Sequence, residues 1–164
     1  MLDLVYYPDE RLKYNCEEVE KFDSSLHKSL DQMFDTMYNA RGIGLAAPQV
    51  GILKRYTVMD VSEDRSEKLE FINPKIIHKS GKEVGEEGCL SIPGYRASVS
   101  RATNVTVVAQ DRKGDEFELE AEGLLAVCLQ HEIDHLNGVL FVDKLSRLKK
   151  QMFKKWYTKH GLDV

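Results

Sequence analysis

The feature that most constrains the fold is the five-residue run from His131 to His135, which reads H-E-I-D-H and has the pattern H-E-x-x-H. Residues four apart lie on the same face of an α-helix. On a helix, therefore, two imidazoles at this spacing can bind one metal ion, and Glu132 can reach a water molecule on that ion. The run predicts a helical metal site and indicates metal-assisted hydrolysis, without identifying the bond that is cut.

The residues around this run predict a buried helix. It is expected to begin near Gly123 and to end at Asn137-Gly138, where glycine can close the last turn. Residues 124–129 are apolar almost all round, so the helix should be central. Two imidazoles and a carboxylate inside a core need polar partners. A metal ion satisfies all three, which favours a metal site over two unrelated histidines on a solvated helix.

Periodic apolar residues along the rest of the chain predict further elements. One helix is expected from about Ser25 to Asn39, capped by Asp23 or Ser24, and another from about Ser146 to His160. Strand-like segments are expected at residues 56–61, 71–77, 99–110 and 116–119, with a mobile polar loop at residues 62–68. Pro74 implies a bulge or a sheet edge. These elements predict an α+β fold, with antiparallel strands packed around the central helix and with N-terminal and C-terminal helices.

The bulk composition limits the class of protein. A chain of 164 residues is expected to form one domain, residues 1–164, with a core that needs no disulfides. Its net charge of -4 argues against DNA as a partner. The sequence has no apolar run of membrane-spanning length and no signal-peptide pattern at its start, so we expect no membrane partner and a cytoplasmic location.

The third metal ligand is the decisive unknown. In one common peptidase pattern the third ligand is a histidine six residues after the second His, but position 141 is Phe. In another pattern the third ligand is a later Glu, and no Glu follows Glu132. Asp143 and Asp163 remain, neither on a convincing helix. Upstream, Cys89 is preceded by a glycine and could supply a thiolate. A lone cysteine is more often a small buried hydrophobic residue, so both interpretations stay open.

Three segments together resemble the signature motifs of bacterial peptide deformylases. They are residues 42–49, 87–91 and 130–136, which match the patterns G-φ-G-φ-A-A-x-Q, E-G-C-φ-S and H-E-x-D-H in that order. The resemblance extends over essentially the whole chain and favours the shorter type with a helical C-terminus. It implies a hydrolase that removes the formyl group from N-formyl-methionyl nascent peptides and releases formate.

The resemblance also implies a role for each matched residue. The metal ligands would be Cys89, His131 and His135. The ion would be Fe²⁺, replaceable by Zn, Ni or Co, although one thiolate with two imidazoles would by itself favour Zn. Glu132 would take a proton from water and then deliver it to the leaving amine. The Gln49 amide and the Leu90 backbone N–H would hold the oxyanion; by itself, Gln49 could equally be a capping residue.

The same resemblance places the substrate. Its backbone would pair like an added strand with Ile43 and Gly44 on one side and Gly88 on the other, and Arg96 would bind the far end of the peptide. The methionine pocket would be lined by Ile43, Leu124, Val127, Cys128 and His131, for which plain core packing is the alternative. Many relatives carry a bulky aliphatic residue where this chain has Gly85, so we expect a more open, less methionine-selective pocket.

The C-terminal segment is strongly basic. It contains Lys144, Arg147, Lys149, Lys150, Lys154, Lys155 and Lys159, with no acid between Asp143 and Asp163. The resemblance implies docking of this helix at the ribosome, where phosphates of ribosomal RNA would be the contact; a solvated helix face is the alternative.

Two competing functions for the whole protein are a small metallopeptidase and a structural metal module. A structural module has no use for Glu132.

Overall fold

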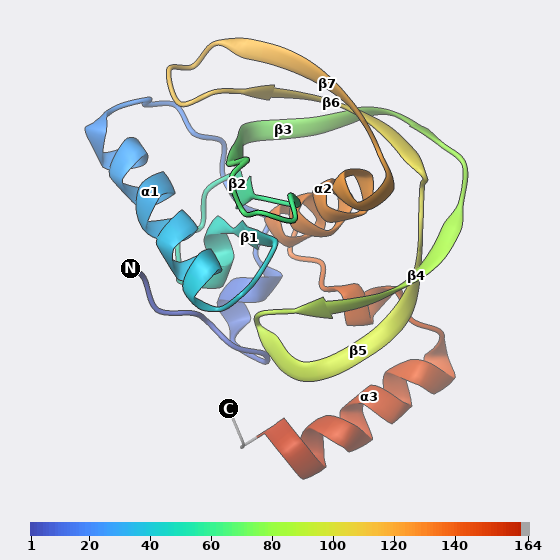
Figure 1. The fold of residues 1–164 in the computed structure, drawn as a ribbon. Coiled ribbons are helices and arrows are strands. Elements are labelled where there is room, and N and C mark those ends of the chain that lie inside the picture. Colours follow the sequence, from blue (N-terminus) through green and yellow to red (C-terminus); the bar gives the residue numbers. More distant parts are fainter. Residues whose placement is uncertain (162–164) are drawn as a thin grey trace.

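The computed structural model describes residues 1–161, which form an α+β fold of antiparallel strands and three α-helices (Figure 1). The helices are α1 (Ser24–Asn39), α2 (Gly123–Leu136) and α3 (Arg147–His160). The strands are β1 (Gly44–Ala46), β2 (Tyr56–Met59), β3 (Leu69–Ser80), β4 (Glu83–Cys89), β5 (Ile92–Arg101), β6 (Asn104–Gln110) and β7 (Glu116–Glu122). Short 3₁₀ segments lie at η1 (Glu10–Lys13), η2 (Ala47–Val50) and η3 (Phe141–Lys144). Asp163 and the end of the expected 1–164 domain lie outside the described residues.

Two antiparallel sheets enclose the central helix. The larger sheet has the order β1-β2-β3-β6-β7, and β4 pairs with β5 in a separate hairpin. Figure 1 shows α2 between the larger sheet and this hairpin. Among the described strands, β1 and β4 therefore each have one edge without a partner strand. These two edges matter because both contribute residues to the same pocket.

Two of the three predicted helices, α1 and α2, begin and end for the reasons that the sequence suggests. Asp23 caps α1, since its carboxylate accepts the backbone N–H of Leu26 at 3.1 Å. The apolar face of α1 is buried against β1 and β2. Helix α2 ends at Leu136 with Asn137 as its C-cap, and Gly138 takes the positive φ of 74° that closes a helix C-terminus. Helix α2 lies between the two sheets and is largely buried from Ala126 onward, whereas Leu124 in its first turn is 54% exposed.

The segment expected to be one strand at residues 99–110 is two strands in different sheets. The chain leaves the hairpin at Arg101 and enters the larger sheet at Asn104. At the break, the Gln130 side chain accepts from the Ala102 N–H at 3.0 Å and donates to the Ala102 carbonyl at 2.9 Å. A side chain from α2 thus replaces the strand partner that this peptide lacks.

Other differences from expectation are local. The small residues at positions 42–49 predict a loop, but residues 44–46 form strand β1, and β4 was not among the predicted strands. Pro74 marks a register shift between Ile72 and Lys75 in the pairing of β3 with β6, so the bulge is confirmed, inside the sheet and not at its edge. No helix within residues 1–161 is long and apolar enough to cross a membrane.

The apolar spacing at residues 146–160 predicts a packed face of Leu148, Met152 and Trp156, but of these only Trp156 packs against the protein, beside Phe153. Leu148 and Met152 are 67% and 57% exposed, whereas Phe153 is only 3% exposed. The Phe153 ring lies 5.1 Å from the ring of Tyr7 and 4.9 Å from that of Tyr95, centroid to centroid. An aromatic cluster therefore docks α3 beside β5.

Candidate metal centre and adjoining pocket

The end of β4 and one face of α2 bring the three predicted ligands together. Cys89 is the last residue of β4, and His131 and His135 are one turn apart on α2. One donor atom from each residue lies within 4.8 Å of the others. The Cys89 Sγ is 3.3 Å from the His135 Nε2. Of the two interpretations of Cys89, this geometry favours the ligand.

The donor set and its surroundings fit a transition-metal ion. One thiolate with two imidazoles is a common set for such ions. The Nδ1 of His131 lies 3.0 Å from the Glu87 carboxylate. An ionised carboxylate only accepts hydrogen bonds, so this nitrogen carries the proton and Nε2 keeps its lone pair for a metal.

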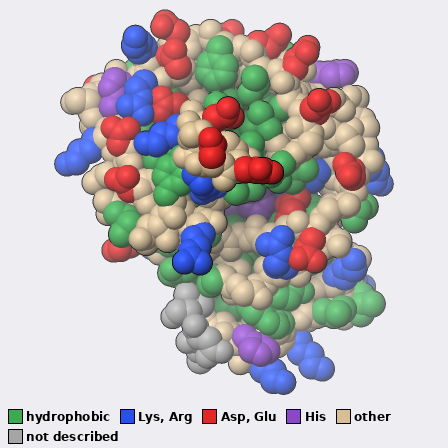
Figure 2. All heavy atoms as spheres, in the orientation of Figure 1, with side chains coloured by type: hydrophobic (Ala, Val, Ile, Leu, Met, Phe, Trp, Pro, Cys, Tyr) green, Lys and Arg blue, Asp and Glu red, His purple; other side chains and the backbone are tan. Residues whose placement is uncertain are grey.

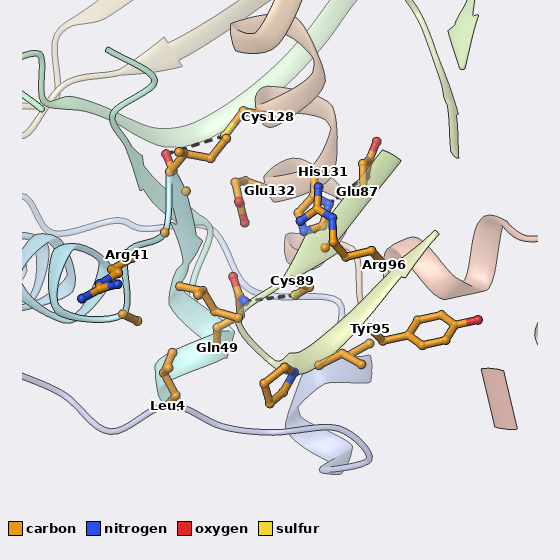
Figure 3. Close-up of a pocket in the computed structure, with 18 of the residues that line it drawn as sticks. Leu4, Arg41, Gln49, Glu87, Cys89, Tyr95, Arg96, Cys128, His131 and Glu132 are labelled. Atoms are coloured by element: carbon orange, nitrogen blue, oxygen red, sulfur yellow. Dashed lines mark hydrogen bonds and ion pairs between the residues drawn. The ribbon is translucent and has the colours of Figure 1, made fainter. Parts of the chain in front are cut away.

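Glu132 is a buried carboxyl group without a protein partner for one of its oxygens. Its Oε1 is completely buried and has no hydrogen-bond partner among residues 1–161. Figure 3 shows its side chain directed into the pocket, on the same side as Gln49. Burial disfavours the ionised carboxylate and raises the pKa of Glu132 to about 7. A carboxyl group of this kind can both take and release a proton near neutral pH.

The pKa values of the two histidines are shifted in opposite directions. Burial lowers the pKa of His135 well below its usual range. Burial also lowers the pKa of His131, but the neighbouring Glu132, Cys89 and Glu87 outweigh it and hold that pKa well above the usual range. The negative charge around His131 therefore favours a cation at its Nε2, either a second proton or, in its place, a metal ion.

A buried ionic network behind His131 was not foreseen. The Arg101 side chain, 4% exposed, donates to both carboxylate oxygens of Glu87 at 2.9 Å and to Asp134 at 2.6 Å. Burial works against ionisation of Glu87, but hydrogen bonds from His131 and Arg101 bring its pKa down to about 2. The sequence contained one signal that Arg101 is buried. Arg101 lies two residues after the apolar Val99, so both side chains point to the same, buried face of the strand.

Gln49 is held so that its amide nitrogen faces the ligands. Its Nε2 donates to Ser91 Oγ at 3.1 Å and lies 3.4 Å from the Cys89 Sγ, while its Oε1 accepts from the Ala46 N–H at 2.9 Å. The two interpretations of Gln49 are thus compatible, because the amide oxygen caps the backbone at Ala46 while the amide nitrogen faces the site. The role of Ser91 was not foreseen either.

A pocket of roughly 700 Å³ opens beside the three ligands. Every predicted substrate-binding residue lines it: Ile43, Gly44, Gly88, Arg96, Leu124, Val127 and Cys128. Gln49, Cys89, Leu90, His131 and Glu132 line it too, whereas His135 lies behind them. Its wall also includes Leu4, Tyr6, Arg41 and Tyr95, which the sequence did not single out (Figure 3).

Gly85 does not line this pocket, so the expectation that it opens one wall is wrong. A Cβ atom added at Gly85 would meet no atom within 4 Å.

Two other glycines, Gly44 and Gly42, are tightly packed against neighbouring side chains. A Cβ at Gly44 would lie 2.3 Å from Glu132 Oε2, and one at Gly42 would lie 2.6 Å from the Leu90 side chain. Because Gly42 and Gly44 have no side chains, the backbone here can lie close to Leu90 and Glu132.

Cys128 is not a second thiolate at the site. Burial raises the pKa of this thiol well above its usual value. Its Sγ instead donates to the Ile43 carbonyl at 3.8 Å (Figure 3). Cys128 thus lines the pocket as a neutral, weakly polar side chain between α2 and the residues before β1.

Comparisons with known proteins agree with this geometry. Residues 1–151 match the family model described as polypeptide deformylase. The peptide deformylase of Chromobacterium violaceum is 56% identical over 154 residues, 94% of this chain and 92% of the relative. That of Neisseria meningitidis serogroup C is 52% identical over the same shares. The crystal structure of a peptide deformylase from Legionella pneumophila has a TM-score of 0.93 at 51% identity, covering 98% of this chain and 95% of that chain. One from Synechococcus elongatus, in complex with actinonin, has a TM-score of 0.89 at 48% identity, covering 94% and 87%.

Proposed function

This chain belongs to the polypeptide deformylase family and removes the N-formyl group from nascent peptides, and on that premise we propose which of its residues carry out the reaction. The observation that carries the proposal is the convergence of Cys89, His131 and His135 on one point beside the buried, unpartnered Oε1 of Glu132. Metal ligands and a proton-transfer group are thus adjacent, at the wall of a pocket large enough for a peptide end.

Cys89, His131 and His135 would hold the metal ion. We propose Fe²⁺ as the ion in the cell, with Zn, Ni or Co as substitutes; the donor set supports a divalent transition metal, and the preference for iron comes from the family resemblance. When bound, the ion supplies Lewis-acid chemistry, by making water more acidic and polarising the formyl carbonyl.

Glu132 is the proposed general base and then general acid. Its unpartnered Oε1 would accept a proton from the attacking water, and the same oxygen would deliver that proton to the amine that leaves with the peptide. The burial that raises its pKa to about 7 suits both steps, because neither protonation state is strongly preferred at neutral pH.

Gln49 and Leu90 are proposed to hold the oxyanion. The Gln49 Nε2 is already directed toward Cys89, and a second donor would be the Leu90 backbone N–H, in the turn between β4 and β5. Donors fixed before the reaction need no reorganisation when charge develops, which is why such groups contribute strongly to catalysis.

The peptide backbone is proposed to lie between the free edges of β1 and β4. The Ile43 carbonyl accepts from the Asp60 N–H at 2.9 Å, toward β2. Backbone groups of successive strand residues point in opposite directions, so those of Gly44 face the pocket. Gly88 lines the pocket on the β4 side, and Arg96 lies beside it. Peptide pairing with Gly44 and Gly88 would then place the methionine side chain among Ile43, Leu124, Val127, Cys128 and His131.

The wider setting is also a proposal. We treat residues 1–164 as one catalytic domain that acts in the cytoplasm, where formylated chains emerge. The basic residues of α3 support docking at the ribosome, since an unpaired basic helix face can contact RNA phosphates. Salt-sensitive co-sedimentation with ribosomes, lost when α3 is deleted, tests the docking; no co-sedimentation at low salt contradicts it.

A formate-release assay on a formyl-Met peptide, with protein purified under anaerobic conditions, tests the proposed site. Cys89→Ala should lose bound metal and activity together. Glu132→Gln should keep the metal and lose activity, because only the proton-transfer group is removed. A metallopeptidase would instead cleave an internal bond of an unformylated peptide, and a structural metal module would bind metal without either activity.

A further inference from the structure

Arg41 lies at the outer wall of the substrate pocket, away from the metal ligands. It lines the 700 Å³ pocket and also a shallow recess formed with Tyr38 and Arg65. Figure 3 shows it on the α1 side of the pocket, with Arg96 on the opposite, β5 side. Figure 2 shows basic side chains on both sides of the hollow at the centre of this face.

The backbone at Arg41 has a conformation that does not favour a side chain. Arg41 follows the C-terminus of α1 and has a φ of +60°, in the left-handed region. Glycine is the usual residue at this position after a helix, because it has no Cβ to clash. The Gly42 N–H donates to the Met37 carbonyl at 2.9 Å, which fixes the turn. An arginine kept in such a conformation suggests a use for its side chain.

The charge of Arg41 is available to a ligand. Across the pocket, the Arg96 Nε donates to Glu86 at 2.6 Å, so that cation is already paired. Arg65 donates to the backbone carbonyls of Asp60 and Gly42 and lies over the Tyr38 ring. Within residues 1–161, Arg41 makes no ion pair.

The position of Arg41 matches the second or third residue of a bound peptide. Under the proposed function the formyl group lies by Glu132, whose carboxyl group is so close to Gly44 that a Cβ added there would clash with it. Residues 43, 42 and 41 then lead away from the reaction centre. Three residues span at most about 11 Å, which an extended peptide also covers in three residues. Arg41, which lines the same pocket, thus lies at a distance from the reaction centre comparable to that of the residues that follow the methionine.

We propose that Arg41 is a specificity-determining residue that favours formyl-Met peptides with an acidic side chain at the second or third position. This rests on the proposed function, because it assumes the same pocket and the same direction of the peptide. The contact is solvent-exposed, so the gain is modest: about two- to five-fold in kcat/KM over the amide analogue, as for exposed ion pairs.

The test compares three peptides that differ only at the third residue: formyl-Met-Ala-Glu, formyl-Met-Ala-Gln and formyl-Met-Ala-Lys, each amidated at its C-terminus, with a second series that varies the second residue. The proposal expects kcat/KM in the order Glu, Gln, Lys in at least one series. The difference should shrink in 1 M salt, where the screening length is about 3 Å. In Arg41→Glu the order should reverse.

Two variants separate this role from folding. Arg41→Gly relieves the left-handed backbone, so it should not lower the melting temperature, yet it should abolish the preference between Glu and Gln. Lys79→Ala, on the exposed end of β3, is the matched control and should keep the preference. Three results would each overturn the proposal. The wild-type enzyme could process the Glu and Gln peptides at equal rates in both series, or it could prefer the Lys peptide. The preference for Glu could also be lost in Arg96→Ala but kept in Arg41→Gly. Lack of formate release from every peptide would instead contradict the proposed function.

Discussion

The Glu87 carboxylate orients a proposed metal ligand, because its Oε1 lies 3.0 Å from the His131 Nδ1 while Arg101 donates to both of its oxygens. The carboxylate is ionised over the whole physiological range, since its pKa is about 2. His131 is therefore held in one tautomer by a partner that cannot itself donate a proton.

Glu87→Gln is expected to weaken metal binding about 10- to 100-fold, as is usual when the carboxylate partner of a ligating histidine is lost. The amide can present its N–H₂ group to His131 and no longer selects the tautomer. Competition with a chromophoric chelator measures the Zn²⁺ affinity. Glu86→Gln, next to it but exposed and paired with Arg96, is the control and should bind Zn²⁺ like the wild type. Equal affinities for Glu87→Gln and wild type would contradict the orienting role.

Gly44→Ala is expected to lower kcat/KM at least about 100-fold, because displacing a catalytic group by 1 Å can have an effect of that size. The new methyl group would lie 2.3 Å from Glu132 Oε2 and 2.8 Å from Cys128 Sγ, so the carboxyl group has to move. Gly85→Ala, where a Cβ meets open space, should keep full activity. Circular dichroism shows whether both variants are folded. A folded, fully active Gly44→Ala enzyme would rule out this packing constraint.

Asp60 is expected to make the fold sensitive to acid. Its carboxylate accepts from Tyr38 Oη at 2.6 Å and from the backbone N–H groups of Ser62 and Glu67. Burial alone would raise the pKa of Asp60, but these hydrogen bonds outweigh it and lower that pKa. The stabilisation is thus present above the unfolded-state pKa of about 3.9 and is lost as the pH falls through the lower, folded-state value.

Urea unfolding between pH 7 and pH 3 measures this effect. At pH 7, Asp60→Asn should be less stable by roughly 1.5–3 kcal/mol, the usual contribution of hydrogen bonds to a charged group. The difference from the wild type should narrow toward pH 3. Asp35→Asn, on the exposed side of α1, is the control and should follow the wild type at every pH. A difference for Asp60→Asn that stays constant with pH would contradict the assignment.

Phe153→Ala is expected to destabilise the protein by about 3–5 kcal/mol, as for other buried aromatic residues. Its ring packs against Tyr7 and Tyr95, and removing it undocks α3. Met152→Ala, one position away but exposed, should change the stability by less than about 0.5 kcal/mol. Chemical denaturation compares the two variants. Similar losses for both would mean that α3 packs through the face that its apolar spacing first suggested.

The parts of the fold that were predictable are those in which local pattern and packing agree. The H-E-x-x-H helix is largely apolar, begins at Gly123, stops just before Asn137-Gly138 and lies between the two sheets. The separation of residues 99–110 into β5 and β6 was not predictable, because alternation shows which face of a strand is buried but not which sheet it joins. That depends on Gln130, a residue of α2 that pairs with the Ala102 peptide.

The missed parts of the site are set by contacts between distant segments. Strand β4 is rich in Glu and Gly and has no apolar alternation, so nothing local marks it as a strand. The loop at residues 62–68, expected to be mobile, is tied to Asp60 and, through Arg65, to the Gly42 carbonyl. The Arg65–Gly42 contact joins residues 23 positions apart, and neither it nor the shorter-range contacts with Asp60 leave a periodic trace in the sequence.

The two free strand edges at the pocket have a consequence for the range of proteins that one enzyme can serve. Every new chain in a cell begins with the same residue and then diverges, yet all share the same main chain. An enzyme that binds its substrate by main-chain hydrogen bonds at β1 and β4 recognises the part of the structure that those chains have in common. A side-chain contact such as that of Arg41 then changes how quickly each chain is processed, without deciding whether it is processed at all.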